Sequence, residues 1–173
     1  SLERVPMDDY LLMISLKTAV LLAGATVMGA ICGGASREDC ERLHTFAMEL
    51  GMAFQIRDDI LDSYGTQASL GKKIGGDIIE GKKTFLTTDA MEVADEDTRR
   101  RLAGLMHNRE MIPDEKVTRV LAIYDALGVR ERAEAAVTRY TDRATAALAG
   151  LSVPAARREP MERLALELTS RWS

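Results

Sequence analysis

Apolar residues recur every three to four positions along most of the chain, which is the spacing of amphipathic α-helices. Glycine and proline mark the ends of several of these segments. Pro113 suits a helix start and Gly128 a helix end, while Pro154 and Pro160 should bracket a break. The pattern predicts seven helices over about 8–33, 36–63, 84–93, 96–107, 113–127, 130–148 and a last segment ending near Arg171.

The first of these segments is unusually apolar. Thr18 to Ser36 form 19 consecutive uncharged positions, the length of a membrane span. Ala25, Gly29 and Gly33 recur every four residues, so they share one helical face on which another helix can approach closely. Because the rest of the chain is highly charged, we expect a buried core helix and no membrane span.

Composition supports one all-α unit over residues 1–173. Alanine and leucine number 23 and 20, against nine valines and nine isoleucines, so good helix formers dominate. The formal net charge of −4 argues against a nucleic-acid partner. Cys32 and Cys40 form no metal-ligand pattern, and no secretory signal is visible at the N-terminus, so we expect free thiols and a cytoplasmic protein.

An acidic cluster is the sharpest chemical feature. Asp58, Asp59 and Asp62 lie within Asp58-Asp59-Ile60-Leu61-Asp62, and Gln55 precedes them by one turn. On a helix, Asp58 and Asp62 stack on one face, where like charges repel unless a cation neutralises them. Carboxylates without nearby histidine or cysteine favour a hard cation, so we predict Mg²⁺ with Mn²⁺ as an alternative. A solvated acidic face is the structural alternative.

A basic, glycine-rich segment follows the carboxylates at 65–83. Lys72 and Lys82 stand among glycines there, and an ammonium group beside flexible backbone suits a phosphate. A nucleotide P-loop does not fit, because five residues separate Gly65 from Gly71 and Lys73 follows Lys72. The alternatives are a diphosphate site next to the metal or a solvated lysine loop.

Lys17 is the only charged residue between Tyr10 and Ser36. A lone lysine on an apolar helix usually extends its ammonium group to the surface. It could instead project into a cavity as a phosphate ligand.

Together these segments resemble a known family. The run Tyr10-x-x-Met13-Ile14-x-x-Lys17-Thr18-Ala19, then LGMAFQIRDDILD at 50–62 and GKKIGGDIIEGKKT at 71–84, is similar to the C-terminal half of the trans-isoprenyl diphosphate synthases, or polyprenyl synthetases. The resemblance implies half of an all-α helical bundle of the isoprenoid synthase type. From the face that carries Ala25, Gly29 and Gly33, we also expect a homodimer.

The family reaction joins an allylic diphosphate to isopentenyl diphosphate. The resemblance implies that Asp58 binds Mg²⁺ directly, and that Asp59 and Asp62 support the metal and its waters. Metal and lysines then stabilise the departing diphosphate, and the double bond of the second substrate captures the carbocation before a proton is lost.

The resemblance also assigns substrate contacts. Lys17, Lys72 and Lys82 would grip the allylic diphosphate, while Thr18 and Gln55 would lie near the departing group and the carbocation. Asp77 and Lys73 have weaker claims.

The family's earlier aspartate-rich motif does not occur in the sequence. Asp95–Arg100 looks similar but has the wrong spacing, so we interpret it as an exposed helix start. We therefore expect these 173 residues to be part of a longer prenyltransferase and inactive alone. A non-catalytic subunit that needs a partner chain is the main alternative; a terpene cyclase lacks its second metal motif here, and a membrane protein is the most distant reading.

Overall fold

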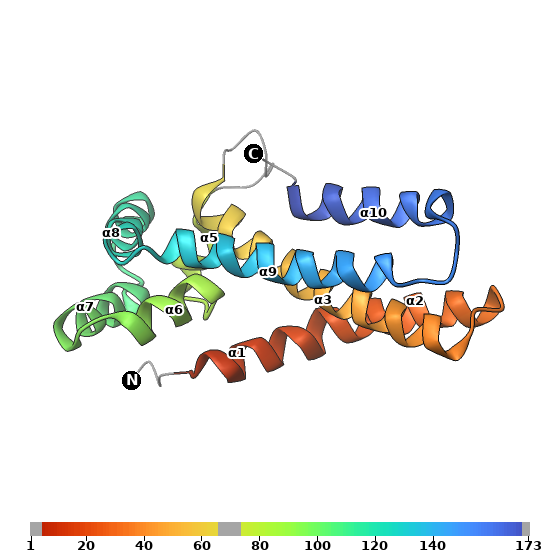
Figure 1. The fold of residues 1–173 in the computed structure, drawn as a ribbon. Helices are drawn as coiled ribbons and strands as arrows, with labels where there is room; N and C mark the ends of the chain where they lie inside the picture. The colour runs from red at the N-terminus through yellow and green to blue at the C-terminus, as the bar shows by residue number, and fades with distance from the viewer. Residues whose placement is uncertain (1–4, 66–73, 171–173) are drawn as a thin grey trace. The chain divides into compact units, whose positions relative to one another are not determined.

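The computed structural model describes residues 5–65 and 74–170, and within these ranges it contains helices and no strand (Figure 1). The elements are α1 (Met7–Ile14), the π-helix η1 (Ser15–Ala19), α2 (Val20–Cys32), α3 (Arg37–Tyr64), α5 (Gly76–Glu80), α6 (Phe85–Val93), α7 (Glu96–His107), α8 (Pro113–Ala126), α9 (Val129–Ala149) and α10 (Ala155–Ser170). The all-α class predicted from composition is confirmed.

The helix boundaries follow local chemistry closely. Thr84 and Asp95 cap α6 and α7 by accepting the backbone N–H groups of Thr87 and Thr98. Pro113 is the first residue of α8, and Gly128, with φ of 66°, separates α8 from α9. These are the boundaries that the sequence predicts.

Pro160 is the clearest error in the predicted boundaries. A break was expected between Pro154 and Pro160, yet α10 runs through Pro160 without interruption. A proline in the second turn removes one hydrogen bond, and its fixed φ still suits a helix. Met161 and Ala165, one turn apart, pack against the apolar core, and this packing outweighs the missing bond.

The chain divides into two compact units. The acidic-motif unit comprises Ile56–Glu134 together with the chain up to Tyr10. The apolar-core unit comprises Leu11–Gln55 and the chain from Ala135 onward. The division falls within the continuous helices α1, α3 and α9.

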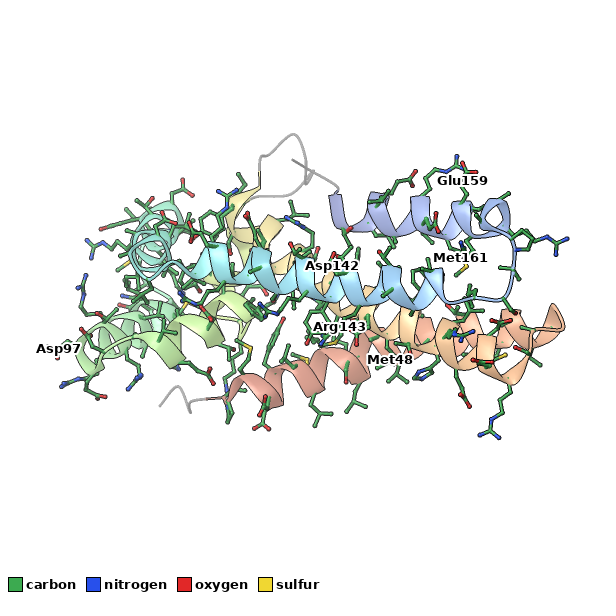
Figure 2. The ribbon with its side chains drawn as sticks, viewed as in Figure 1. Met48, Asp97, Asp142, Arg143, Glu159 and Met161 are labelled. Atoms are coloured by element: carbon green, nitrogen blue, oxygen red, sulfur yellow. The ribbon has the colours of Figure 1, made fainter. Side chains whose placement is uncertain are left out.

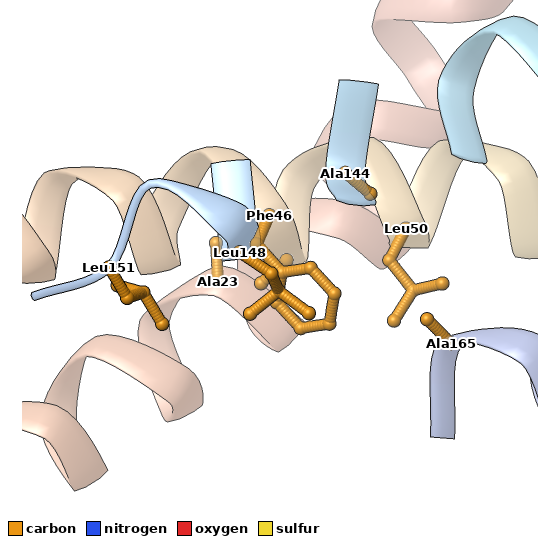
Figure 3. Close-up of a cluster of buried hydrophobic side chains, with 8 residues drawn as sticks. Ala23, Phe46, Leu50, Ala144, Leu148, Leu151 and Ala165 are labelled. Carbon is orange, nitrogen blue, oxygen red and sulfur yellow. The ribbon is translucent and has the colours of Figure 1, made fainter. Parts of the chain in front are cut away.

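Small and branched side chains form the centre of the apolar-core unit (Figure 3). Phe46 and Leu50 of α3 meet Leu148 of α9 there, and each side chain is at most 2% exposed. Met48 of α3 and Met161 of α10 (both labelled in Figure 2) cover the cluster. Burial of this kind contributes about 1.5–3 kcal/mol for each large side chain.

The helix Met7–Cys32 is not the buried core helix that the sequence predicts. Ala25, Gly29 and Gly33 are exposed, and no atom lies within 4 Å of a Cβ built on Gly29. The buried line on η1 and α2 runs instead through Ala19 and Ala23. The helix carries apolar residues on every side, so hydropathy alone could not identify the face that packs against its neighbours.

The close helix contact exists at another position. A Cβ on Gly51 of α3 would lie 2.7 Å from the Cα of Ala19, so the backbones of η1 and α3 nearly touch there.

The helix Met7–Cys32 also has the length and apolar character of a membrane span, with a mean hydropathy of 1.9, while 17% of that stretch is buried.

Candidate functional site

The three carboxylates of the acidic motif lie in the last turns of α3 but have different surroundings. Asp58 is exposed, Asp59 is 4% exposed and Asp62 is partly buried. Within the described residues, no three acidic, histidine or cysteine side chains converge as a ready metal site. The predicted cluster is therefore three carboxylates in different environments.

Asp59 fastens α3 to two other helices of the acidic-motif unit. Its Oδ2 accepts the hydroxyl of Tyr10 in α1 and, at 2.7 Å, the backbone N–H of Phe85 at the start of α6. A carboxylate at a helix N-terminus also interacts favourably with the helix dipole. Burial, and then the charge of Asp59, raise the pKa of Tyr10 well above its usual value, so this hydroxyl stays a donor.

Asp62 holds the short helix α5. Its Oδ2 accepts the backbone N–H of Asp77 at 2.8 Å, and its carbonyl oxygen accepts the N–H of Gly75 at 2.6 Å. Burial is the main cause that raises the pKa of Asp62, and the N–H of Asp77 opposes it. The acidic motif is thereby joined directly to the segment that carries the predicted basic residue.

Lys82 follows α5 and is paired with carboxylates. Its Nζ lies 2.8 Å from Oδ1 of Asp77 and 2.9 Å from Oε2 of Glu80, and its side chain is 54% exposed. The hydrogen bonds to Asp77 and then Glu80 raise the pKa of Lys82, so it is a cation at neutral pH. Its ammonium group is accessible to an anion that competes with these carboxylates.

Thr18 and Gln55 meet in the apolar-core unit, where Oγ1 of Thr18 donates to Oε1 of Gln55 at 3.1 Å. Thr18 and the exposed Lys17 belong to η1, a π-helical turn between α1 and α2. No local sequence signal predicts this turn. Single π-turns within α-helices occur frequently at functional sites, because they redirect side chains locally.

Lys72 and Lys73 lie outside the described residues. Asp95 caps α7 and Asp97 is exposed on it (Figure 2), so this segment is the helix start that the sequence predicts. A hollow of about 650 Å³ between α7 and α8, lined by residues such as Arg101, Leu105 and Ile123, contains none of the predicted site residues.

Sequence reasoning missed several buried polar groups in the acidic-motif unit. Thr87 bonds Tyr124 at 2.8 Å, and Arg132 pairs with Asp89 at 2.6 Å. Lys116 is 2% exposed. Its position four residues before Val120, on the apolar face of α8, was the available signal.

The acidic motif provides suitable donors for a divalent cation. Asp58 and Asp62 stand one turn apart on α3 and offer only oxygen atoms, which Mg²⁺ and Mn²⁺ prefer. Mg²⁺ commonly takes one or two carboxylates and completes its shell with water and phosphate oxygens. The donor set therefore fits such an ion, with Asp58 on the exposed side.

Comparison with known proteins identifies the class. The sequence model for Polyprenyl synthetase matches residues 1–126, so the chain belongs to the polyprenyl synthetase family. It is 39% identical over 117 residues to a short chain isoprenyl diphosphate synthase of Methanocaldococcus jannaschii, a match covering 68% of this chain and 36% of that protein. It is 36% identical over 152 residues to heptaprenyl diphosphate synthase component 2 of Geobacillus stearothermophilus, covering 88% and 46% of the two chains.

Solved structures of similar proteins support the same family assignment. A geranylgeranyl pyrophosphate synthetase from Pyrococcus horikoshii matches with a TM-score of 0.88 at 29% identity, over 96% of this chain and 50% of that one. A geranylgeranyl pyrophosphate synthase from Corynebacterium glutamicum, complexed with calcium and isoprenyl diphosphate, gives 0.80 at 31% identity, over 96% and 51%. The chain spans about half the length of these proteins or less.

Proposed function

We propose that this chain forms part of a trans-prenyltransferase that joins an allylic diphosphate to isopentenyl diphosphate and releases diphosphate and a proton. One observation carries the proposal. Asp62 of the acidic motif accepts the backbone N–H of Asp77, and the carboxylate of Asp77 forms an ion pair with Lys82. A diphosphate needs cations beside it as its C–O bond breaks, and this series of contacts, which links a lysine to the acidic motif through Asp77, supports the proposal.

In this proposal Asp58 and Asp62 would bind Mg²⁺ or Mn²⁺. Asp59 would orient this end of α3 through its hydrogen bonds with Tyr10 and Phe85. The bound metal would neutralise negative charge on the departing diphosphate. Lys82 would exchange its carboxylate partners for diphosphate oxygens, since its side chain is more than half exposed.

The remaining predicted contacts stay proposals. We expect Lys17 and Lys72 to bind diphosphate, and Thr18 and Gln55 to lie near the allylic carbon. The hydrogen bond between Thr18 and Gln55 supports a shared task for these two side chains. Product chain length is not assigned.

A second copy of the chain is the proposed partner. Leu16, Leu21, Met28 and Ile31 are each at least 63% exposed on η1 and α2, and such an apolar face is typical of an interface. The name of the Geobacillus relative, a component 2, points to a different chain as the competing possibility. Analytical ultracentrifugation of the purified complete protein distinguishes a dimer from a monomer that needs another subunit.

The test is incorporation of labelled isopentenyl diphosphate into acid-labile product by the complete protein, with Mg²⁺ present. Replacing Asp58 by Ala should remove turnover, because losing a metal ligand costs several kcal/mol of transition-state stabilisation. Glu159→Ala on the exposed side of α10 is the matched control and should keep full activity. Wild-type turnover in Asp58→Ala would contradict the assignment. We expect no turnover from the 173 residues alone, which carry one acidic motif.

A further inference from the structure

Lys116 is a buried charge to which the proposed reaction gives no task. It lies on α8 and is 2% exposed. Its Nζ donates to three backbone carbonyl oxygens: Ile79 at 3.1 Å, Met106 at 2.8 Å and Asn108 at 3.1 Å. An ammonium group has three hydrogens, so this arrangement satisfies it fully.

These acceptors belong to the ends of two other helices. Ile79 is in α5, whereas Met106 and Asn108 form the C-terminal end of α7. The last carbonyls of a helix have no partner within the helix and carry partial negative charge, so a buried cation suits them. Burial lowers the pKa of Lys116, and the three carbonyl contacts compensate for the lost hydration.

The short helix α5 depends on contacts of this kind. It has five residues, too few to be stable by itself, and it contacts both α7 and α8. Gly81 and Gly75 bound it with φ of 70° and 77°. A Cβ on Gly81 would lie 2.7 Å from the carbonyl oxygen of Met106, so α5 rests directly on the end of α7.

The same helix carries the polar groups of the candidate site. Asp77 donates its N–H to Asp62, and both its carboxylate and its carbonyl oxygen hold Lys82, each at 2.8 Å. We propose that Lys116 is a positioning residue that fixes α5 between α7 and α8, and thereby sets the position of Asp77 and of Lys82, which meets the diphosphate. This inference rests on the proposed function.

The experiment compares Lys116→Met with Arg119→Met in the complete protein. Methionine keeps an unbranched apolar chain but removes all three donors. Arg119 lies one turn further on α8, is 57% exposed and has a surface ion pair, so it controls for changes to the helix itself. Amide hydrogen exchange over 74–84 reports on α5, and titration with inorganic pyrophosphate and Mg²⁺ reports on the site.

Exchange over 74–84 should accelerate about tenfold or more in Lys116→Met and stay unchanged in Arg119→Met, because the charged hydrogen bonds to α5 and to the end of α7 are lost only in the first. Pyrophosphate affinity should fall about tenfold, with KM for the allylic substrate rising more than kcat falls. Unchanged exchange in a folded Lys116→Met protein would overturn the inference, as would faster exchange with unchanged affinity.

Two further results keep the test decisive. If Lys116→Met does not fold, Gly81→Ala replaces it, since its Cβ crowds the Met106 carbonyl oxygen that accepts a hydrogen bond from Lys116; unchanged exchange there overturns the inference. If wild-type protein does not bind pyrophosphate, the proposed function fails, and the exchange comparison still decides whether Lys116 holds α5.

Discussion

The two units of this chain both contain buried apolar side chains but differ in the polar groups that they bury beside them. The interior of the acidic-motif unit contains Asp59, Thr87 and Lys116, each at most 4% exposed and each hydrogen-bonded. The core of the apolar-core unit is built from side chains such as Phe46 and Leu148. Buried polar groups require partners in fixed directions, whereas apolar packing tolerates more arrangements. The buried polar contacts of the acidic-motif unit can therefore hold the carboxylates and Lys82 in fixed directions.

The largest effect on stability should come from the apolar core. Replacing Phe46 by Ala removes a ring that is 2% exposed and should lower the free energy of unfolding by about 3–5 kcal/mol. Phe54→Ala, at a position 39% exposed on the same helix, is the control and should cost much less. Urea denaturation of both variants measures this; equal losses would show that the cluster is not the core.

An effect of similar size should follow from breaking the buried polar anchor. Asp59→Ala leaves the hydroxyl of Tyr10 and the N–H of Phe85 without their acceptor, at about 1–3 kcal/mol for each buried group. Asp58→Ala, one residue away and exposed, should change stability by less than about 0.5 kcal/mol. Thermal unfolding separates the two, and a stable Asp59→Ala protein would refute the anchoring role.

Two glycines sharpen the comparison within the apolar-core unit. Gly51→Ala places a methyl group against Ala19 and should cost about 1–3 kcal/mol through overpacking. Gly29→Ala meets no atom within 4 Å, so the better helix propensity of alanine should leave stability equal or slightly higher. Denaturation midpoints at low protein concentration provide the measurement. A loss at Gly29 equal to that at Gly51 would mean that the Gly29 face is covered.

The smallest effect concerns pH, at a polar contact of the apolar-core unit. The hydroxyl and N–H of Ser152 hold the pKa of Asp39 below its usual value. A carboxyl with a lowered pKa in the folded state adds stability above its unfolded pKa, and this is lost as pH falls through its folded pKa. Asp39→Asn should therefore flatten the acid limb of the stability curve below about pH 4, the usual pKa of an aspartate in an unfolded chain. An unchanged acid limb would count against this contact.

Much of the fold could be predicted from sequence because helix signals are local. Capping residues such as Asp95, the position of Pro113 and the period of apolar residues act within one or two turns. Pro160 shows the limit of such signals, since packing of Met161 and Ala165 decided that α10 continues. The sequence predicts only that Thr18 and Gln55 lie near the same reacting groups, not that they form a hydrogen bond. It does not predict the π-turn to which Thr18 belongs.

The sequence by itself determined the all-α class, most helix boundaries, the family and the candidate residues, because these depend on residue types at short spacing. Only the tertiary structure decided that Asp58 is exposed while Asp59 is buried, although the two are adjacent. It also decided that η1 contacts α3 at Gly51 and that Lys116 joins three segments. Residues distant in the chain bury these side chains and supply their hydrogen-bond partners. A local sequence pattern does not specify which distant residues will pack against it.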